Sequence, residues 1–276
     1  MMKLKKTDLK QFLLFTEKLA REAGKILSVG FSKSKKVSYK GRIDPVTEYD
    51  LKSEKLIITD IVKKYPQHSI LAEEGSCREN DSPFRWVIDP LDGTVNYMHR
   101  FPVYSVSIAL EYNNRTIAGA VFAPEQNELY SAAESMGAFL NGKRIKVSSE
   151  IRLHRSLLAT GFAYNLTTAR KNNLGMFSKM MKHAQAVRRL GSAALDLCWL
   201  AAGRLDGFWE YYLHPWDTAA AMLIVKEAGG KVTKINGDKY SIFDNEILAS
   251  NGYIHSSMIK VLTGKTIKKQ KREKPL

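Results

Sequence analysis

Apolar side chains between residues 8 and 30 recur at the spacing of an α-helix. Leu9, Leu13, Leu19, Ala23 and Leu27 share one face of this segment, with polar side chains opposite. The pattern predicts a long amphipathic helix. A second helix is expected from about residue 48 to residue 65, where the pair Tyr65-Pro66 ends it.

The segments that follow are typical of strands. Residues 84–89 (FRWVID) predict a buried strand, and three segments with alternating or apolar character come next: VYSVSIALEY, RTIAGAVFAP and ELYSAAE. The segment GAFLNGKRI contains an Asn-Gly pair, which favours a tight hairpin turn. Together they predict an antiparallel sheet flanked by helices.

After about residue 150, short strands alternate with alanine-rich helices. Strands are expected at 156–162 and 183–190, with weaker ones at 230–235 and 246–250, and helices at 191–203 and 216–230. No internal repeat or long linker separates the segments. The chain is therefore expected to form a single domain over residues 1–276, with halves of about 1–149 and 150–264 and a basic tail at 265–276.

Composition narrows the class of protein. The chain has 276 residues, of which 44% are hydrophobic, so it can bury a large core. It has no apolar run of about 18 residues, and its first residues (MMKLKKTDLK) do not look like a signal peptide. Only Cys77 and Cys198 occur, far apart. These features favour a cytoplasmic protein that makes no membrane contact.

The formal net charge of +15 is concentrated at the two ends. Residues 1–40 carry 11 Lys/Arg against 3 Asp/Glu, and residues 260–276 carry 7 against 1. Such ends can be solvated surface, or they can attract RNA or another acidic partner.

Acidic residues recur where the expected elements begin or end. They lie in DPVTEYD (44–50), AEEGS (72–76), IDPLDGT (88–94) and HPWDTAA (214–220). Single acids have simple structural explanations: Thr47 to Asp50 fits a capping box, Asp217 fits the first turn of a helix, and Glu73-Glu74 fits a solvated turn.

Asp89 and Asp92 are harder to explain structurally, because they lie three residues apart after a buried strand and just before Gly93-Thr94. A turn of this kind offers carboxylates to cations and backbone amides to phosphate. Oxygen ligands without a histidine or cysteine cluster favour Mg²⁺ over Zn²⁺. A divalent-metal phosphate site therefore explains the pair best. The haloacid-dehalogenase motif D-x-D-G-T does not fit, because the spacing here is one residue longer.

With these motifs in order, the chain resembles the inositol monophosphatase family of Mg²⁺-dependent, lithium-sensitive phosphatases. The resemblance covers residues 8–262 and depends on WVIDPLDGTVNYMHRFP and WDTAAAMLIVKEAGG, supported by DPVTEYD and AEEGS. It implies an α/β (α+β) fold, the five-layered α-β-α-β-α sandwich also found in fructose-1,6-bisphosphatase. It also implies a homodimer that hydrolyses phosphate monoesters of small polyols with roughly two or three Mg²⁺ ions per site.

The resemblance also implies roles for individual residues. The metal ligands would be the four carboxylates and one backbone carbonyl of Glu73, Asp89, Leu91, Asp92 and Asp217. Asp50 and Thr94, together with the metal ligand Glu73, would act in catalysis by orienting the attacking water. The substrate would contact Leu91, Asp92, Gly93, Thr94, Arg188, Ala193, Glu210 and Asp217, with the Gly93 and Thr94 amides holding the phosphate.

The expected substrate is inositol monophosphate. The segment DGTVNY resembles the inositol-phosphate branch, whereas His214-Pro215 and GRLDGFWE (203–210) resemble prokaryotic members, some of which accept sugar bisphosphates or histidinol phosphate. Fructose-1,6-bisphosphatase or histidinol-phosphatase activity stays open, as does a non-catalytic role in RNA or transcription complexes through the basic ends. His99 and His214 are expected to pack or face solvent.

Overall fold

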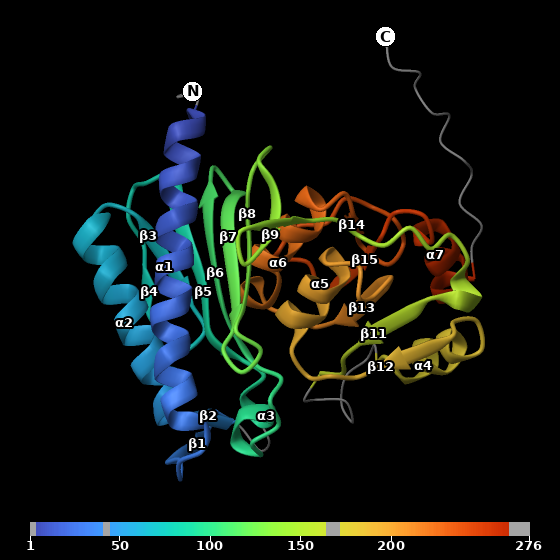
Figure 1. Cartoon of the computed structure of the whole chain (residues 1–276), viewed down its shortest axis with the longest axis horizontal. Helices are drawn as coiled ribbons and strands as arrows, with labels where there is room; N and C mark the ends of the chain where they lie inside the picture. The colour runs from blue at the N-terminus through green and yellow to red at the C-terminus, as the bar shows by residue number, and fades with distance from the viewer. Residues whose placement is uncertain (1–3, 41–44, 164–171, 265–276) are drawn as a thin grey trace.

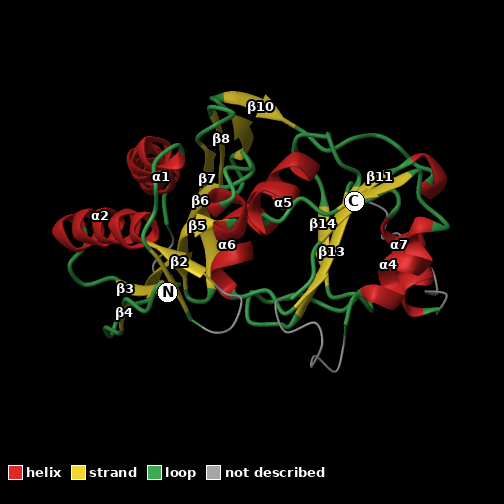
Figure 2. Ribbon diagram, turned by 90° about the horizontal axis from the view of Figure 1, so that it is seen from below, coloured by secondary structure: helices red, strands yellow, loops and turns green. Residues whose placement is uncertain are grey.

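The computed structural model describes residues 4–40, 45–163 and 172–264. The described elements form five layers in the order helix, sheet, helix, sheet, helix (Figures 1 and 2). The expected sandwich is confirmed. Asp44 and the basic tail at 265–276 lie outside the described residues.

The first two layers come from the N-terminal half. Helices α1 (Lys6–Phe31) and α2 (Glu48–Lys64) cover one face of an eight-stranded sheet in the order β10-β9-β8-β7-β6-β5-β3-β4 (Figure 1). The strands are β3 (Ser69–Ala72), β4 (Cys77–Arg78), β5 (Phe84–Asp92), β6 (Ser105–Tyr112), β7 (Arg115–Ala123), β8 (Glu128–Ala133), β9 (Gly137–Leu140) and β10 (Lys143–Ile145). All pairs are antiparallel except β3 with β5.

The middle layer contains α5 (Ala193–Ala201) and α6 (Pro215–Glu227), which lie between the two sheets (Figure 2). Both helices are rich in alanine and apolar residues and are buried on almost every side, as expected for helices with a sheet on each face. A single apolar cluster fills this layer, with members from both sheets such as Val121 and Phe208.

The last two layers come from the C-terminal half. A five-stranded sheet has the order β12-β11-β13-β15-β14, and α4 (Leu174–Met181) and α7 (His255–Thr263) cover its outer face (Figure 2). The strands are β11 (Leu157–Thr160), β12 (Ala186–Arg188), β13 (Gly207–Tyr211), β14 (Lys231–Thr233) and β15 (Glu246–Ser250).

Short elements connect these layers. Strands β1 (Val37–Tyr39) and β2 (Pro45–Thr47) form a separate antiparallel pair, α3 (Thr94–Met98) follows β5, and a 3-10 turn covers Leu153–Arg155. No helix in the described ranges is long and apolar enough to span a lipid bilayer.

Most of the expected elements are confirmed, including the short strands β11, β12, β14 and β15, whereas several other short elements were missed. The two N-terminal helices, the central strands and the hairpin at Asn141-Gly142, where both residues have positive φ, agree with the sequence pattern. Strands β1 to β4 and β13 and helices α4 and α7 were not expected. Each is nine residues or shorter, which leaves little periodicity to detect.

Candidate active site

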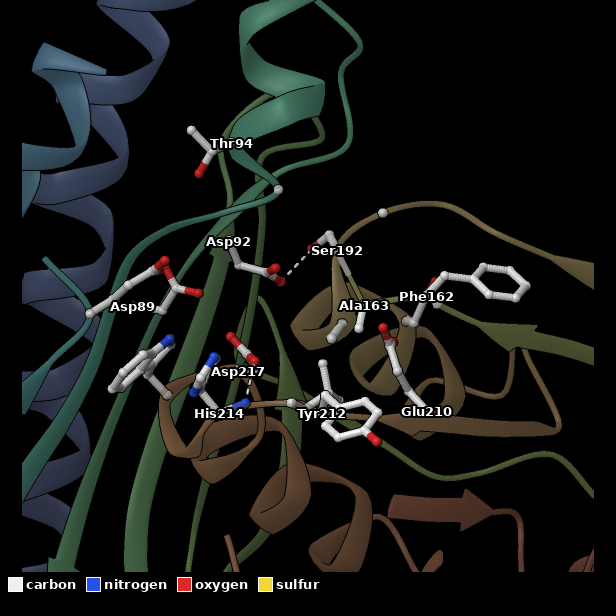
Figure 3. A pocket seen from close by; sticks show the side chains of 18 of the residues that line it. Asp89, Asp92, Thr94, Phe162, Ala163, Ser192, Glu210, Tyr212, His214 and Asp217 are labelled. Carbon is white, nitrogen blue, oxygen red and sulfur yellow. Dashed lines mark hydrogen bonds between the residues drawn. The ribbon is translucent and has the colours of Figure 1, made fainter. Parts of the chain in front are cut away.

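The irregular end of β5 explains how Asp89 and Asp92, which are three residues apart, both face the same pocket. In a regular strand, residues three apart point to opposite faces. Here the pairing of β5 with β6 shifts register between Asp89 and Asp92, so that both carboxyl groups line one pocket (Figure 3). The irregular segment is held from α2, because the Ser53 hydroxyl donates a hydrogen bond to the Pro90 carbonyl (2.9 Å). A bulge at a strand end is a common way to redirect side chains toward a site.

Gly93 makes the sharp turn from β5 into α3. Its φ is +91°, in the left-handed region. A Cβ at this position would lie 2.9 Å from the carbonyl oxygen of Val103 and 3.2 Å from that of Gly191. Only glycine meets both requirements, so the residue after Asp92 is fixed by backbone geometry.

The middle helices bring the C-terminal half to the same place. Ser192 caps α5, and its hydroxyl donates to Asp92 Oδ2 (2.6 Å), which also accepts from the Ala194 amide (2.9 Å). Asp217 lies in the first turn of α6 and accepts from the His214 amide (2.6 Å). The first-turn explanation for Asp217 is therefore correct, and it does not exclude a role in the pocket.

These elements enclose a cavity of about 610 Å³ between the two halves (Figure 3). Its lining includes most of the residues expected from the sequence: Glu73, Asp89, Leu91, Asp92, Gly93, Thr94, Ala193, Glu210 and Asp217. Asp50 does not line the cavity but contacts Thr94 behind it. Arg188 is exposed and is not among the lining residues, whereas its neighbour Arg189 is.

Burial and mutual repulsion make the carboxylates hard to ionise. Removal from water raises the pKa of Asp89 well above its ordinary value, and the charges of Glu73, Asp92 and Asp217 raise it further. The pKa of Asp217 is raised well above its ordinary value by the same effects. The pKa of Asp92 is raised to about 6 by burial, although its hydrogen bonds from Ser192 and Ala194 oppose the shift. A cation among these groups would reverse the repulsion.

The donor set fits a hard divalent cation. Four carboxylates and the Leu91 carbonyl supply only oxygen, and no histidine or cysteine joins them in the lining except His214, whose ring stacks on Trp216 (4.9 Å between centroids). Within the described part of the chain, no three His, Cys, Asp or Glu side chains are already arranged around one point. Binding would therefore require the carboxylates to rotate toward the ion.

Lys40 is the cation nearest to this set among the described interactions. Its ammonium group lies 3.1 Å from Glu73 Oε1 and 2.8 Å from Glu74 Oε1. The carboxylates raise the pKa of Lys40 despite its partial burial, so it stays charged. The solvated-turn explanation for Glu73-Glu74 is wrong for Glu74, whose side chain is only 4% exposed.

Asp50 and Thr94 form a second, smaller unit beside the carboxylates. The Thr94 hydroxyl lies 3.3 Å from Asp50 Oδ1 and 3.0 Å from the Leu91 carbonyl. Asp50 Oδ2 accepts from the amide and hydroxyl of Thr47, which completes the expected capping box of α2. Burial raises the pKa of Asp50 to about 6, a value suited to accepting a proton near neutral pH.

Several lining residues were missed from the sequence. They include Lys40, Phe162, Arg189, Ser192, Asp196, Tyr212, Trp216 and Asn245. Ser192 could have been found, because a serine before an alanine-rich helix is a common cap. Asp196 and Trp216 lie on α5 and α6, and the others lie in loops or at strand ends. The position of all of them depends on the packing of the two halves. His99 is exposed and outside the lining, as expected.

Comparison with known proteins decides the family. The family model described as "Inositol monophosphatase family" matches residues 8–272. The chain belongs to the inositol monophosphatase family. A solved inositol monophosphatase from Anabaena (Nostoc) has the same fold, with a TM-score of 0.86 and 40% identity, covering 93% of this chain and 97% of that one.

Two curated relatives of this family carry different names. The Synechocystis protein named inositol-1-monophosphatase is 43% identical over 93% of this chain and 90% of its own length. The Escherichia coli protein named Nus factor SuhB is 41% identical over 87% of this chain and 91% of its own length. Both therefore align over nearly the whole family domain.

Proposed function

We propose that this member of the inositol monophosphatase family is a Mg²⁺-dependent hydrolase of inositol monophosphate. The observation that carries the proposal is the cavity in which Asp89, Asp92 and Asp217 repel one another beside Glu73. The family match and the name of the Synechocystis relative support the same activity. A bound divalent cation would neutralise phosphate charge and lower the pKa of an attacking water.

In this proposal different residues of the cavity bind the cations, the phosphate and the alcohol portion of the substrate. Glu73, Asp89, Asp92, Asp217 and the Leu91 carbonyl hold the cations, as their all-oxygen chemistry favours. The amides of Gly93 and Thr94 bind the phosphate at the turn after β5. Ala193 and Glu210, which lie on α5 and β13, contact the alcohol portion of the substrate.

Asp50 and Thr94 position the attacking water. Asp50 accepts a hydrogen bond from the Thr94 hydroxyl, whose oxygen then accepts one from the water. The proton of the water passes toward Asp50, whose pKa of about 6 leaves it ionised above neutral pH. No side chain is required to form a covalent bond with phosphate.

Phosphate release from inositol monophosphate, fructose 1,6-bisphosphate and histidinol phosphate tests the proposal. Release should require Mg²⁺, should stop with EDTA, and should be fastest with inositol monophosphate. The Asp217→Asn variant should lose at least about a hundredfold in kcat with an unchanged circular dichroism spectrum. Equal rates with and without Mg²⁺ would contradict the proposed chemistry, and a faster bisphosphate or histidinol phosphate would reassign the substrate.

Three further properties belong to the same proposal. We expect a homodimer, inhibition by lithium and a cytoplasmic location, in line with the resemblance of the motifs to this family. We also propose that residues 1–264 act as one domain, with 265–276 as a basic tail. Gel filtration with light scattering tests the dimer directly.

A second candidate is a role in an RNA-containing transcription complex. The name Nus factor SuhB on a relative that is 41% identical favours it, as does the basic charge of residues 1–40 and 260–276. Exposed lysines such as Lys10, Lys18 and Lys25 on α1 provide one basic surface. The two functions are compatible, because the cavity and this surface use different residues.

A further inference from the structure

Helix α5 places a second carboxyl group in the cavity beside Glu210. Asp196 follows Ala193 by three residues, so the two share one face of the helix, and both line the cavity. Asp196 is only 2% exposed. Asp196 is not part of the sequence motifs that indicate the cation site. The proposed contact of Glu210 with the alcohol portion of the substrate does not involve Asp196 either.

Asp196 lacks a hydrogen-bond donor from the described part of the protein. Its Oδ1 atom is buried and has no partner there. Glu210 is 8% exposed and likewise accepts no hydrogen bond from a described residue, whereas Asp92 accepts two. A buried acceptor without a donor is destabilising, so such a pair calls for a donor from outside the chain.

Structural roles do not account for Asp196. An acid in the first turn does favour the helix dipole, but a solvent-exposed position would provide this without the cost of burial. Arg189 attracts both carboxylates, yet its side chain is exposed and forms no ion pair with either within the described residues. Burial and the neighbouring Glu210 and Asp92 charges raise the pKa of Asp196 well above its ordinary value.

The chemistry of the pair defines its ligand. In the proposed function the amides of Gly93 and Thr94 hold the phosphate, which leaves Asp196 and Glu210 to face the alcohol portion of the substrate. Adjacent hydroxyl groups on an alcohol can donate one hydrogen bond to each carboxyl. A site built to bind hydroxyl groups rejects analogues that lack them, because its buried acceptors then stay unsatisfied.

We propose that Asp196 is a specificity-determining residue that, together with Glu210, accepts hydrogen bonds from adjacent hydroxyl groups of the substrate alcohol. The inference rests on the proposed phosphatase function and extends it to the choice of substrate. It selects phosphate esters of polyols over esters of alcohols without neighbouring hydroxyls. Phenyl phosphate has a ring of similar size without hydroxyl groups, so it is the matched probe.

The experiment compares inositol monophosphate and phenyl phosphate in wild type, Asp196→Ala and Asp196→Asn. In Asp196→Ala, kcat/KM for inositol monophosphate should fall about tenfold or more, mainly through KM, while that for phenyl phosphate should stay within about twofold. Asp196→Asn keeps the size and one acceptor, so its loss should be intermediate.

Asp206→Asn provides the matched control. Asp206 is also buried in the C-terminal half, but it accepts hydrogen bonds from the Ser148 hydroxyl and the Leu157 amide and does not line the cavity. Its variant should lower thermal stability without changing the ratio of the two substrates. A structural role for Asp196 would give this same pattern.

The outcomes separate the two proposals. Equal losses on both substrates in the Asp196 variants would overturn the inference and leave the phosphatase function standing. A wild type that hydrolyses neither substrate with Mg²⁺ would overturn the proposed function and the inference with it. If wild type prefers glucosamine 6-phosphate to glucose 6-phosphate by more than about tenfold, and Asp196→Asn abolishes the preference, the pair binds an ammonium group and the hydroxyl assignment is wrong.

Discussion

At the scale of single residues, the Thr94 hydroxyl has one proton and two acceptors within reach. Asp50 Oδ1 lies at 3.3 Å and the Leu91 carbonyl at 3.0 Å. If Leu91 binds a cation through its carbonyl, the hydroxyl must donate to Asp50, which leaves the Thr94 oxygen free to accept a hydrogen bond from water. We expect Thr94→Val to lower kcat by at least about a hundredfold with little change in KM, because the backbone amides stay in place.

Thr94→Ser is the control for this prediction. Serine keeps the hydroxyl group, so Thr94→Ser should retain most of kcat. Valine has the shape of threonine but no hydroxyl group, so Thr94→Val should not. Steady-state kinetics on inositol monophosphate measure both values. A rise in KM with kcat preserved would make Thr94 a binding residue and leave the water to be positioned by another group.

The raised pKa of Glu210 makes the free energy of unfolding depend on pH. Burial, with a further contribution from Asp92, raises the pKa of Glu210 from 4.5 to about 8. Between these values the folded state keeps a proton that the unfolded state has lost, so wild-type stability falls as the pH rises from about 4.5 to 8. Glu210→Gln removes this titration. Its free energy of unfolding, relative to wild type, should therefore increase by about 1 kcal/mol or more between pH 5 and pH 8.5.

Urea denaturation in EDTA at the two pH values measures the effect. Groups that do not interact with Glu210 titrate in the same way in both proteins, so their contribution cancels, whereas Asp196 and Asp217 interact electrostatically with Glu210 and contribute to the measured difference. A difference between variant and wild type that is the same at pH 5 and pH 8.5 would show that Glu210 is already ionised in the folded protein.

For single residues, the sequence predicts which side chains carry the chemistry better than it predicts where those side chains lie. Asp89, Asp92 and Asp217 could be singled out because their residue types and neighbours are informative locally. Arg189 and Asp196 could not, because their approach to the cavity depends on how α5 packs against the end of β5. The choice of Arg188 over Arg189 shows how a shift of one residue reverses which side chain faces a site.

At the scale of elements, the contact between α6 and β7 sets the position of Asp217. A Cβ at Gly119 of β7 would lie 2.8 Å from Ala220 Cα, one helical turn after Asp217. We expect Gly119→Ala to push α6 away from the sheet and to lower both stability, by about 1–3 kcal/mol, and kcat, because Asp217 moves relative to Asp89. Thermal melts and phosphate release measure the two effects.

Gly175→Ala is the control at this scale. Gly175 lies in α4, where an added Cβ meets nothing within 4 Å. Alanine should therefore stabilise the helix by about 0.5–1 kcal/mol and leave kcat unchanged. If Gly119→Ala melts at the wild-type temperature with full activity, the contact between α6 and β7 has room to adjust and does not position Asp217.

The long elements were predictable, and the bulge was not. Helix α1 and strands β6 and β7 have periodic or continuous apolar patterns, because each lies against a layer on one or both faces. The register shift in β5 depends on pairing with β6 and on the contact from Ser53, which are distant in sequence. Local patterns contain no information about such contacts.

At the scale of the whole molecule, the five layers separate an acidic cavity from basic surface. The cavity lies between the two halves, whereas exposed lysines of α1 lie on an outer layer (Figure 1). The positive charge of residues 1–40 and 260–276 can be counted from the sequence, because net charge is additive along the chain, but its separation from the cavity depends on the fold. The choice of inositol monophosphate over a sugar bisphosphate or histidinol phosphate comes from the resemblance of the motifs, because the shape of the alcohol site depends on residues from several elements.

The basic tail provides the last prediction. Deleting residues 265–276 removes six Lys/Arg and one Glu. If these charges neutralise RNA phosphates, the truncated protein should bind RNA more weakly, and log K should depend less steeply on log salt, by about 0.7 for each lost phosphate contact. Turnover of inositol monophosphate should stay the same, because among the residues that the structure describes none beyond Asn245 lines the cavity. A full-length variant with the six tail Lys/Arg replaced by Gln controls for length and should match the truncation. Filter binding across a salt series measures the slopes, and an absence of RNA binding by the wild type at low salt would contradict the second function and leave the phosphatase alone.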